Sequence, residues 1–199
     1  MLSFFAMKIY KQLTLKRKEI IILLFLSFFF NINAQKLDSL IIWDENYKLS
    51  WNDFSGTPNY KKRITALSFL EMQLIRAYSN NEIYSYTIIP TFNRFHSYSK
   101  NKSSDNLLEH EQIHFDIQEI FARKLRKQFQ KLKRNNACDI SYIEVYNENN
   151  ILLKKYQYKF DVLTDYSSNK DEQNTWKSLI LIKLNELDSY NAKKHYGIR

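Results

Sequence analysis

The longest regular pattern of hydrophobic residues in the chain has the period of an α-helix. Positions three and four apart form one continuous stripe, made of Leu107, His110, His114, Ile117, Phe121, Leu125, Phe129 and Leu132. Ser103, Ser104 and Asp105 precede it as good N-cap residues, and acidic side chains lie early in the segment while basic ones lie late. The sequence therefore predicts a helix at about residues 105–134, with two histidines on its apolar stripe.

Upstream of this segment the pattern changes to the alternation that is typical of β-strands. Residues 38–54 suggest short strands, and the turn that follows is marked by Gly56 and Pro58. Residues 63–76 predict a strand with five residues on one face: Ala66, Ser68, Leu70, Met72 and Leu74. Residues 82–90 predict another strand, which Pro90 either ends or places at a sheet edge.

Downstream of the long segment the pattern favours helices. Residues 139–147 fit a strand or a short helix, whereas residues 152–163 and 176–187 have helical spacing, and residues 190–199 resemble a frayed tail. Strands followed by helices indicate an α+β fold, with N-terminal antiparallel strands, a long central helix and C-terminal helices.

The N-terminal residues 1–34 have the features of a secretory signal peptide. A basic stretch is followed by an apolar run from Ile20 to Phe30, and small Ala34 stands at the cleavage position. That run is short for a membrane span, although an uncleaved anchor remains the alternative. We therefore predict an exported protein, secreted or periplasmic, with one domain at residues 35–199 and no membrane span after cleavage.

Charge and cysteine content narrow the class of protein further. The net charge of +9 falls to +5 without residues 1–34, because that segment carries five Lys or Arg and one Glu. No basic stripe with interleaved aromatic residues is present, which argues against nucleic acid as a partner. Cys138 is the single cysteine, so an exported chain of this length must fold around a hydrophobic core without an internal disulfide.

The predicted long helix contains the motif H-E-x-x-H, formed by His110, Glu111 and His114. Histidines four apart lie on one face of a helix, where both imidazoles can bind one Zn²⁺ ion. A glutamate between them can accept a proton from a water molecule at the metal. This pattern predicts a zinc site in which Glu111 is the general base.

Several segments also resemble a bacterial domain-of-unknown-function family described as predicted secreted zinc-dependent proteases. The similarity includes Leu49-x-Trp51-x-Asp53-Phe54-x-Gly56-x-Pro58, the helix segment from Leu107 to Glu119, and Phe160-Asp161-x-x-Thr164 followed by Gln173 and Trp176. The resemblance implies a zincin-like fold and hydrolysis of peptides. It departs at one point, because the family's C-terminal His-Gly is replaced by Tyr166-Ser167.

That replacement leaves the third metal ligand open. A catalytic zinc ion usually has three protein ligands and a water molecule. Asp161 and Tyr166 are the first candidates, because they stand at or near family positions; His96 ranks next and His195 last.

Two further residues are expected to orient the histidines. Asp116 and Thr164 could accept the second ring N–H of a ligating histidine.

The favoured hypothesis is a zinc-dependent metallopeptidase acting on a peptide or protein substrate. The alternative is a catalytically inactive zincin-like module with a binding or structural role in the cell envelope.

Overall fold

A computed structural model describes residues 39–61, 64–79 and 82–196. The predicted signal peptide at residues 1–34 lies outside these ranges. The fold below is that of the compact unit Ile41–Arg199, with strand β1 (Leu40–Ile42) starting one residue before it. Among the described residues, no helix combines the length and the apolar character that crossing a membrane requires.

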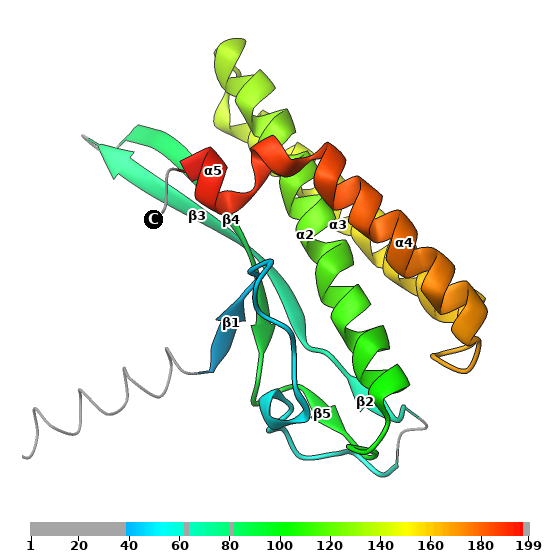
Figure 1. The fold of residues 1–199 in the computed structure, drawn as a ribbon. Helices are drawn as coiled ribbons and strands as arrows, with labels where there is room; N and C mark the ends of the chain where they lie inside the picture. Colours follow the sequence, from blue (N-terminus) through cyan, green and yellow to red (C-terminus); the bar gives the residue numbers. More distant parts are fainter. Residues whose placement is uncertain (1–38, 62–63, 80–81, 197–199) are drawn as a thin grey trace, which may run out of the picture. The chain divides into compact units, whose positions relative to one another are not determined.

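The described part of the chain confirms the α+β class, with strands on the N-terminal side and helices after them (Figure 1). The order is β1 (Leu40–Ile42), η1 (Trp51–Asp53), β2 (Ala66–Leu67), β3 (Leu70–Ser79), β4 (Glu82–Asn93), β5 (Tyr98–Ser99), α2 (Asp105–Arg134), α3 (Asp139–Leu163), α4 (Lys170–Glu186), η2 (Asp188–Tyr190) and α5 (Ala192–Tyr196).

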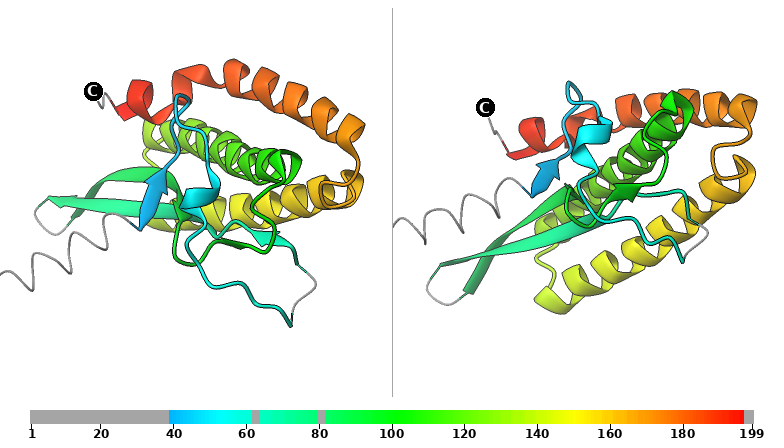
Figure 2. Two further views of the ribbon diagram at one scale, coloured as in Figure 1. Left: turned by 60° about the horizontal axis from the view of Figure 1, so that its bottom comes forward. Right: turned by 90° about the horizontal axis from the view of Figure 1, so that it is seen from below.

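Helix α2 has the bounds that the hydrophobic period predicts, and it lies at the centre of this unit. Figures 1 and 2 show α3 and α4 flanking it, with the β3–β4 hairpin on a further side. Ser104 caps the helix, since its Oγ accepts a hydrogen bond from the Leu107 amide at 3.2 Å. Every residue from Phe115 to Arg123 is buried, so neighbouring elements cover this middle stretch of α2 on all faces.

The longer sheet has the strand order β1-β4-β3, and β2 pairs separately with β5. The prediction that Pro90 ends its strand or lies at an edge is wrong, because β4 continues to Asn93 as the central strand. The Pro90 carbonyl accepts a hydrogen bond from the Trp43 amide at 3.2 Å, so its nitrogen also faces β1. Since β1 is only three residues long, little pairing is lost there.

The strand predicted at residues 63–76 is interrupted at Ser68 and Phe69. The Ser97 hydroxyl accepts a hydrogen bond from the Phe69 amide at 2.8 Å, and the Phe69 carbonyl accepts one from the Asn93 amide at 2.9 Å. The strand expected near Trp51 is instead a 3-10 turn, because the Asp53 carboxylate accepts hydrogen bonds from the Ser50 amide and hydroxyl. Both departures come from side chains that bond to the backbone.

The C-terminal region is more helical than the sequence pattern predicts. Residues 139–163 form the single helix α3, and part of the predicted tail forms η2 and α5. The hydroxyl of Tyr196 accepts a hydrogen bond from the Ile88 amide at 2.7 Å, and Arg126 lies over its ring. These contacts attach the end of the described chain to β4 and α2.

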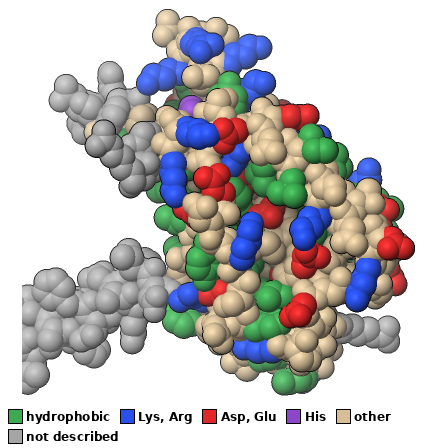
Figure 3. Space-filling model, viewed as in Figure 1, with side chains coloured by type: hydrophobic (Ala, Val, Ile, Leu, Met, Phe, Trp, Pro, Cys, Tyr) green, Lys and Arg blue, Asp and Glu red, His purple; other side chains and the backbone are tan. Residues whose placement is uncertain are grey.

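A buried charge cluster joins α2 to three of its neighbours. Glu119 Oε1 accepts hydrogen bonds from Arg123 Nε at 2.8 Å and from Arg126 Nη1 at 3.0 Å. The two guanidinium groups also donate to the backbone carbonyls of Ile88, Leu184 and Tyr190. The surface in Figure 3, by contrast, carries exposed charges of both signs side by side.

Replacing Glu119 with glutamine should lower the free energy of unfolding by about 3–5 kcal/mol, because two buried guanidinium groups would lose their carboxylate. Urea denaturation of the variant and the wild type measures this difference. The exposed Glu186 provides a matched control, and Glu186→Gln should change stability by less than about 0.5 kcal/mol. Equal urea midpoints for Glu119→Gln and the wild type would contradict this interpretation.

Candidate metal centre

One large cleft runs between α2, α3 and the segment that contains β2 and the start of β3. Its volume is about 980 Å³. Helix α2 contributes Leu107, His110, Glu111, His114 and Gln118, which share one face because they are three or four residues apart. The same spacing brings one face of α3 to the cleft, and residues 64–72 form the opposite wall.

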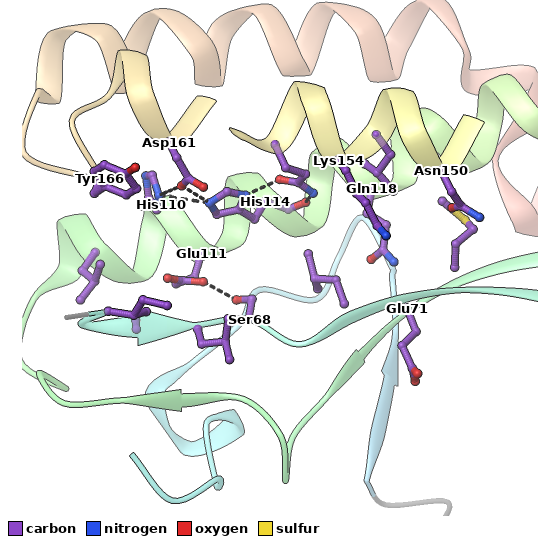
Figure 4. Close-up of a pocket in the computed structure, with 18 of the residues that line it drawn as sticks. Ser68, Glu71, His110, Glu111, His114, Gln118, Asn150, Lys154, Asp161 and Tyr166 are labelled. Carbon is purple, nitrogen blue, oxygen red and sulfur yellow. Dashed lines mark hydrogen bonds and ion pairs between the residues drawn. The ribbon is translucent and has the colours of Figure 1, made fainter. Parts of the chain in front are cut away.

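Three potential metal-binding side chains converge in this cleft (Figure 4). Asp161 Oδ1 lies 3.1 Å from His110 Nε2 and 2.8 Å from His114 Nε2, and the two Nε2 atoms are 3.1 Å apart. Of the His, Cys, Asp and Glu groups in the described residues, these three form a cluster whose donor atoms lie within 4.8 Å of one another. Helix α2 thus supplies the two imidazoles, and α3 supplies the carboxylate.

Two glutamines fix the orientation of the imidazole rings. Gln157 Nε2 donates to the His114 carbonyl at 2.9 Å, and Gln157 Oε1 lies in hydrogen-bond contact with His114 Nδ1. Gln173 Nε2 likewise donates to the Asn106 carbonyl at 3.0 Å, and its Oε1 lies 3.3 Å from His110 Nδ1. Because each amide nitrogen already donates to the backbone, each amide oxygen must accept from Nδ1–H. Both Nε2 atoms then face Asp161, where each can bind a cation through its lone pair or, when the ring is protonated, donate to the carboxylate.

Aromatic packing holds the two rings from the side. The ring of Phe160 stacks on His110 with centroids 4.5 Å apart, and it meets His114 edge-on at 4.9 Å. Phe160 is fully buried and precedes Asp161 directly. The same turn of α3 therefore supplies the carboxylate and the apolar surface against which both imidazoles pack.

The electrostatics of the cluster favour the charged forms of Asp161 and His114. Burial acts to lower the pKa of His114, but its hydrogen bond with Asp161 and the charge of Glu111 raise that pKa overall. Burial opposes ionisation of Asp161 as well, yet hydrogen bonds from His110 and His114 hold the pKa of this carboxyl well below its usual range. The cluster can therefore hold the Asp161 carboxylate beside a protonated His114.

Glu111 lies in the same cleft but points in another direction. Its Oε2 accepts a hydrogen bond of 2.5 Å from the Ser68 hydroxyl, which comes from the break between β2 and β3. Figure 4 shows the carboxylate turned toward that wall, while the imidazoles turn toward α3. Glu111 is 5% exposed, so a carboxylate is held inside the cleft near the histidines.

The other candidate ligands lie apart from the three converging donors or at the margin of the cleft. Tyr166 lines the cleft, but its side chain is 61% exposed, and no hydrogen bond to the cluster is present among the described residues. His96 is exposed and packs against Phe69, and His195 packs against Tyr190 and Tyr196. Asp161 is thus the candidate that the structure brings to both histidines.

Asp116 and Thr164 do not contact the histidines in the way the sequence analysis expects. Asp116 Oδ1 accepts hydrogen bonds from Trp43 Nε1 at 2.7 Å and from Gln112 Nε2 at 2.9 Å. Thr164 Oγ1 donates to the Phe160 carbonyl at 2.7 Å, at the end of α3. Asp116 lies two residues past His114 and therefore faces another side of α2. Thr164 bonds to its own helix end.

The glutamines that take this role were not predicted. A signal for Gln173 exists in the sequence, since it stands at one of the positions that resemble the protease family. Gln157 precedes Asp161 by four residues and therefore shares its face of α3. Spacing from the predicted carboxylate, rather than residue type alone, could have identified it.

The contacts of Asp161 predict a pH-dependent stability for the protein in the presence of a chelator. A lowered aspartate pKa stabilises the fold above about pH 4, and a raised histidine pKa stabilises it below about pH 6.5. Asp161→Asn should therefore lose about 1–3 kcal/mol near pH 5 and less at pH 8. Thermal unfolding across this range measures the difference, with the exposed Asp165→Asn as control; a pH-independent difference would contradict the ionic contact.

Comparison with protein-family models, curated proteins and solved structures gives no match to this chain. The resemblance to secreted zinc-dependent proteases therefore depends on the residues named above. Two imidazoles and the carboxylates of Asp161 and Glu111 line the same cavity, and this geometry determines what the cleft can do chemically.

Proposed function

We propose that this protein is a zinc-dependent hydrolase whose substrates are peptides. The observation that carries the proposal is the convergence of His110, His114 and Asp161 in a cleft that also contains Glu111. Two imidazole nitrogens and one carboxylate oxygen form a donor set that Zn²⁺ commonly takes in catalytic sites. We further propose a zincin-like domain that is exported through a signal peptide at residues 1–34, which is removed from the mature protein.

The three side chains fit a zinc ion in both chemistry and spacing. Donor atoms around a tetrahedral zinc ion lie about 3.3 Å apart, given bonds of about 2.0–2.1 Å. The separations of 2.8–3.1 Å between the three donors are slightly shorter, so small side-chain movements would suffice. A bound zinc ion would supply a Lewis acid that polarises a carbonyl group and makes water more acidic.

Glu111 is the residue suited to move protons in this cleft. Its carboxylate would accept a proton from a water molecule as the water oxygen attacks the peptide carbonyl carbon. It would then deliver this proton to the amine nitrogen as the C–N bond breaks, which leaves a carboxylate and a free amine. Ser68 donates to one carboxylate oxygen, so it would keep the other oxygen directed into the cleft.

The proposed ligands predict that the protein binds zinc and that substitutions at the site lower its zinc affinity by different amounts. The purified protein should bind about one zinc ion per chain, and His114→Ala should abolish this binding. Gln157→Leu should weaken zinc affinity about 10–100-fold, because His114 loses the acceptor that orients it. Competition with a coloured chelator measures these affinities. The exposed His96→Ala is the control, and a wild-type protein that binds no zinc would refute the proposed site.

The proposed general base predicts a separation of metal binding from hydrolysis. Glu111→Gln should keep its zinc but cleave a fluorogenic peptide library at least about 10²-fold more slowly. Glu144→Gln, on the exposed side of α3, should cleave at the wild-type rate. A wild-type protein that binds zinc but cleaves no peptide would instead favour an inactive binding or structural module.

A further inference from the structure

The cleft continues well beyond the proposed metal site. Along α2 it extends one helical turn past His114 to Gln118, and along α3 it passes Lys154 and Asn150 to Tyr146. The Tyr146 hydroxyl donates a hydrogen bond to the Met72 carbonyl, which connects α3 with β3. Among the described residues no side chain of α3 beyond Tyr146 lines the cleft. This end of the cleft is therefore closed by a contact between its two walls.

Near this closed end lies a buried polar side chain that lacks a partner. Gln118 is 1% exposed, and its Oε1 atom has no hydrogen bond among the described residues. A buried acceptor left without a donor costs about 1–3 kcal/mol. A protein core would ordinarily place an apolar residue there, so a donor from outside the protein is a reasonable partner for this amide.

Lys154 provides the positive charge at the same end. Its side chain lines the cleft, and Figure 4 shows it extending from α3 toward Gln118. Within the described residues, Lys154 has neither an ion pair nor a hydrogen bond. The carboxylates that line this cleft are already held or turned away: Asp161 contacts the histidines, Glu111 contacts Ser68, and Glu71 points to the far side of β3 in Figure 4.

We propose that the closed end is a subsite for a carboxylate group of the peptide, which Lys154 binds and Asn150 assists. Gln118 Oε1 would accept an N–H group of the same peptide. The inference rests on the proposed function and names its substrate class, namely peptides that carry negative charge near the cleaved bond. An ammonium group with a neighbouring amide is a common carboxylate partner, because a hydrogen bond to a charged group is stronger than a neutral one.

Helix geometry sets the position of this carboxylate along the peptide. Lys154 precedes Asp161 by seven residues, which corresponds to about 10 Å along α3. An extended peptide advances about 3.3 Å per residue, so the carboxylate lies about three residues from the proposed metal site. It can belong to an acidic side chain or to the C-terminus of the peptide, since both present the same group.

Peptide binding tests the subsite independently of catalysis. Each fluorescent hexapeptide of a set carries a single Glu, at a different position in each peptide, and an amidated C-terminus. Each is compared with the same peptide in which Gln replaces the Glu. A further peptide contains no Glu and has a free C-terminal carboxylate. Affinities for the full-length protein are measured by fluorescence anisotropy with zinc present. At least one acidic peptide should bind about tenfold more tightly than its neutral counterpart, and the pattern shows which carboxylate is recognised.

Variants of Lys154 provide the decisive comparison. Lys154→Ala should bind acidic and neutral peptides equally, and Lys154→Glu should prefer a peptide with Lys at the recognised position. Lys155→Ala removes the neighbouring exposed charge, which does not line the cleft, and should retain the wild-type preference. Gln118→Leu should weaken the binding of acidic and neutral peptides to the same extent.

The possible outcomes separate this subsite from the proposed hydrolysis. Equal wild-type affinity for acidic and neutral peptides, no measurable binding of any acidic peptide, or an unchanged preference in Lys154→Ala would each overturn the subsite. A protein that cleaves peptides without regard to charge would keep its proposed function and lose the subsite. A protein that binds acidic peptides through Lys154 but cleaves none would keep the subsite and lose the peptidase proposal.

Discussion

Burial of helix α2 by its neighbours, which covers His110, Glu111 and every residue from Phe115 to Arg123, is the constraint on which the rest of this structure depends. A helix covered on every face cannot leave charged or polar side chains to water, so the neighbouring elements must supply partners. In its C-terminal half, Glu119 meets this need for Arg123 and Arg126, which also bond to carbonyls of surrounding elements. In its N-terminal half, α3 and α4 supply Asp161, Gln157 and Gln173 to the two histidines. The buried charges that stabilise the fold and the histidines of the candidate site are thus satisfied in the same way, by partners from neighbouring elements.

This arrangement places the chemistry on rigid elements. Both imidazoles project from the central helix, and their partners project from α3 and α4, which pack directly against it. Glu111 is held from the opposite wall by Ser68, whose position follows from the backbone bonds that interrupt β2 and β3. Side chains held by packed helices and by hydrogen bonds lose little further freedom when a ligand binds. The histidines, Asp161 and Glu111 are therefore already held in position within the cleft.

Several of these features could be read from the sequence, and others could not. The period of α2 predicted its bounds, because every third or fourth residue faces a buried neighbour. Asp161 could be named as a candidate from the sequence, but only tertiary packing shows that it, rather than Tyr166 or His96, lies beside both histidines. In the sequence, Gln157 cannot be distinguished from other polar residues of an amphipathic helix. Its role becomes visible only in the structure, where it contacts His114. The prediction for Pro90 is wrong for a related reason. The effect of a proline on a sheet depends on the strand that its nitrogen faces, and here that strand is the short β1.

The backbone of the turn between α3 and α4 bears on the residue types at positions 166 and 167. Asp165, Tyr166 and Ser167 have φ angles of 45°, 50° and 79°, in the left-handed region that glycine adopts without penalty. Each such residue costs about 1–2 kcal/mol when it carries a side chain. A glycine at position 167 would adopt this backbone conformation without that cost. With serine there, the turn beside the cleft holds a backbone strain that a glycine would relieve, whereas His110, His114 and Asp161 lie on α2 and α3, outside this turn.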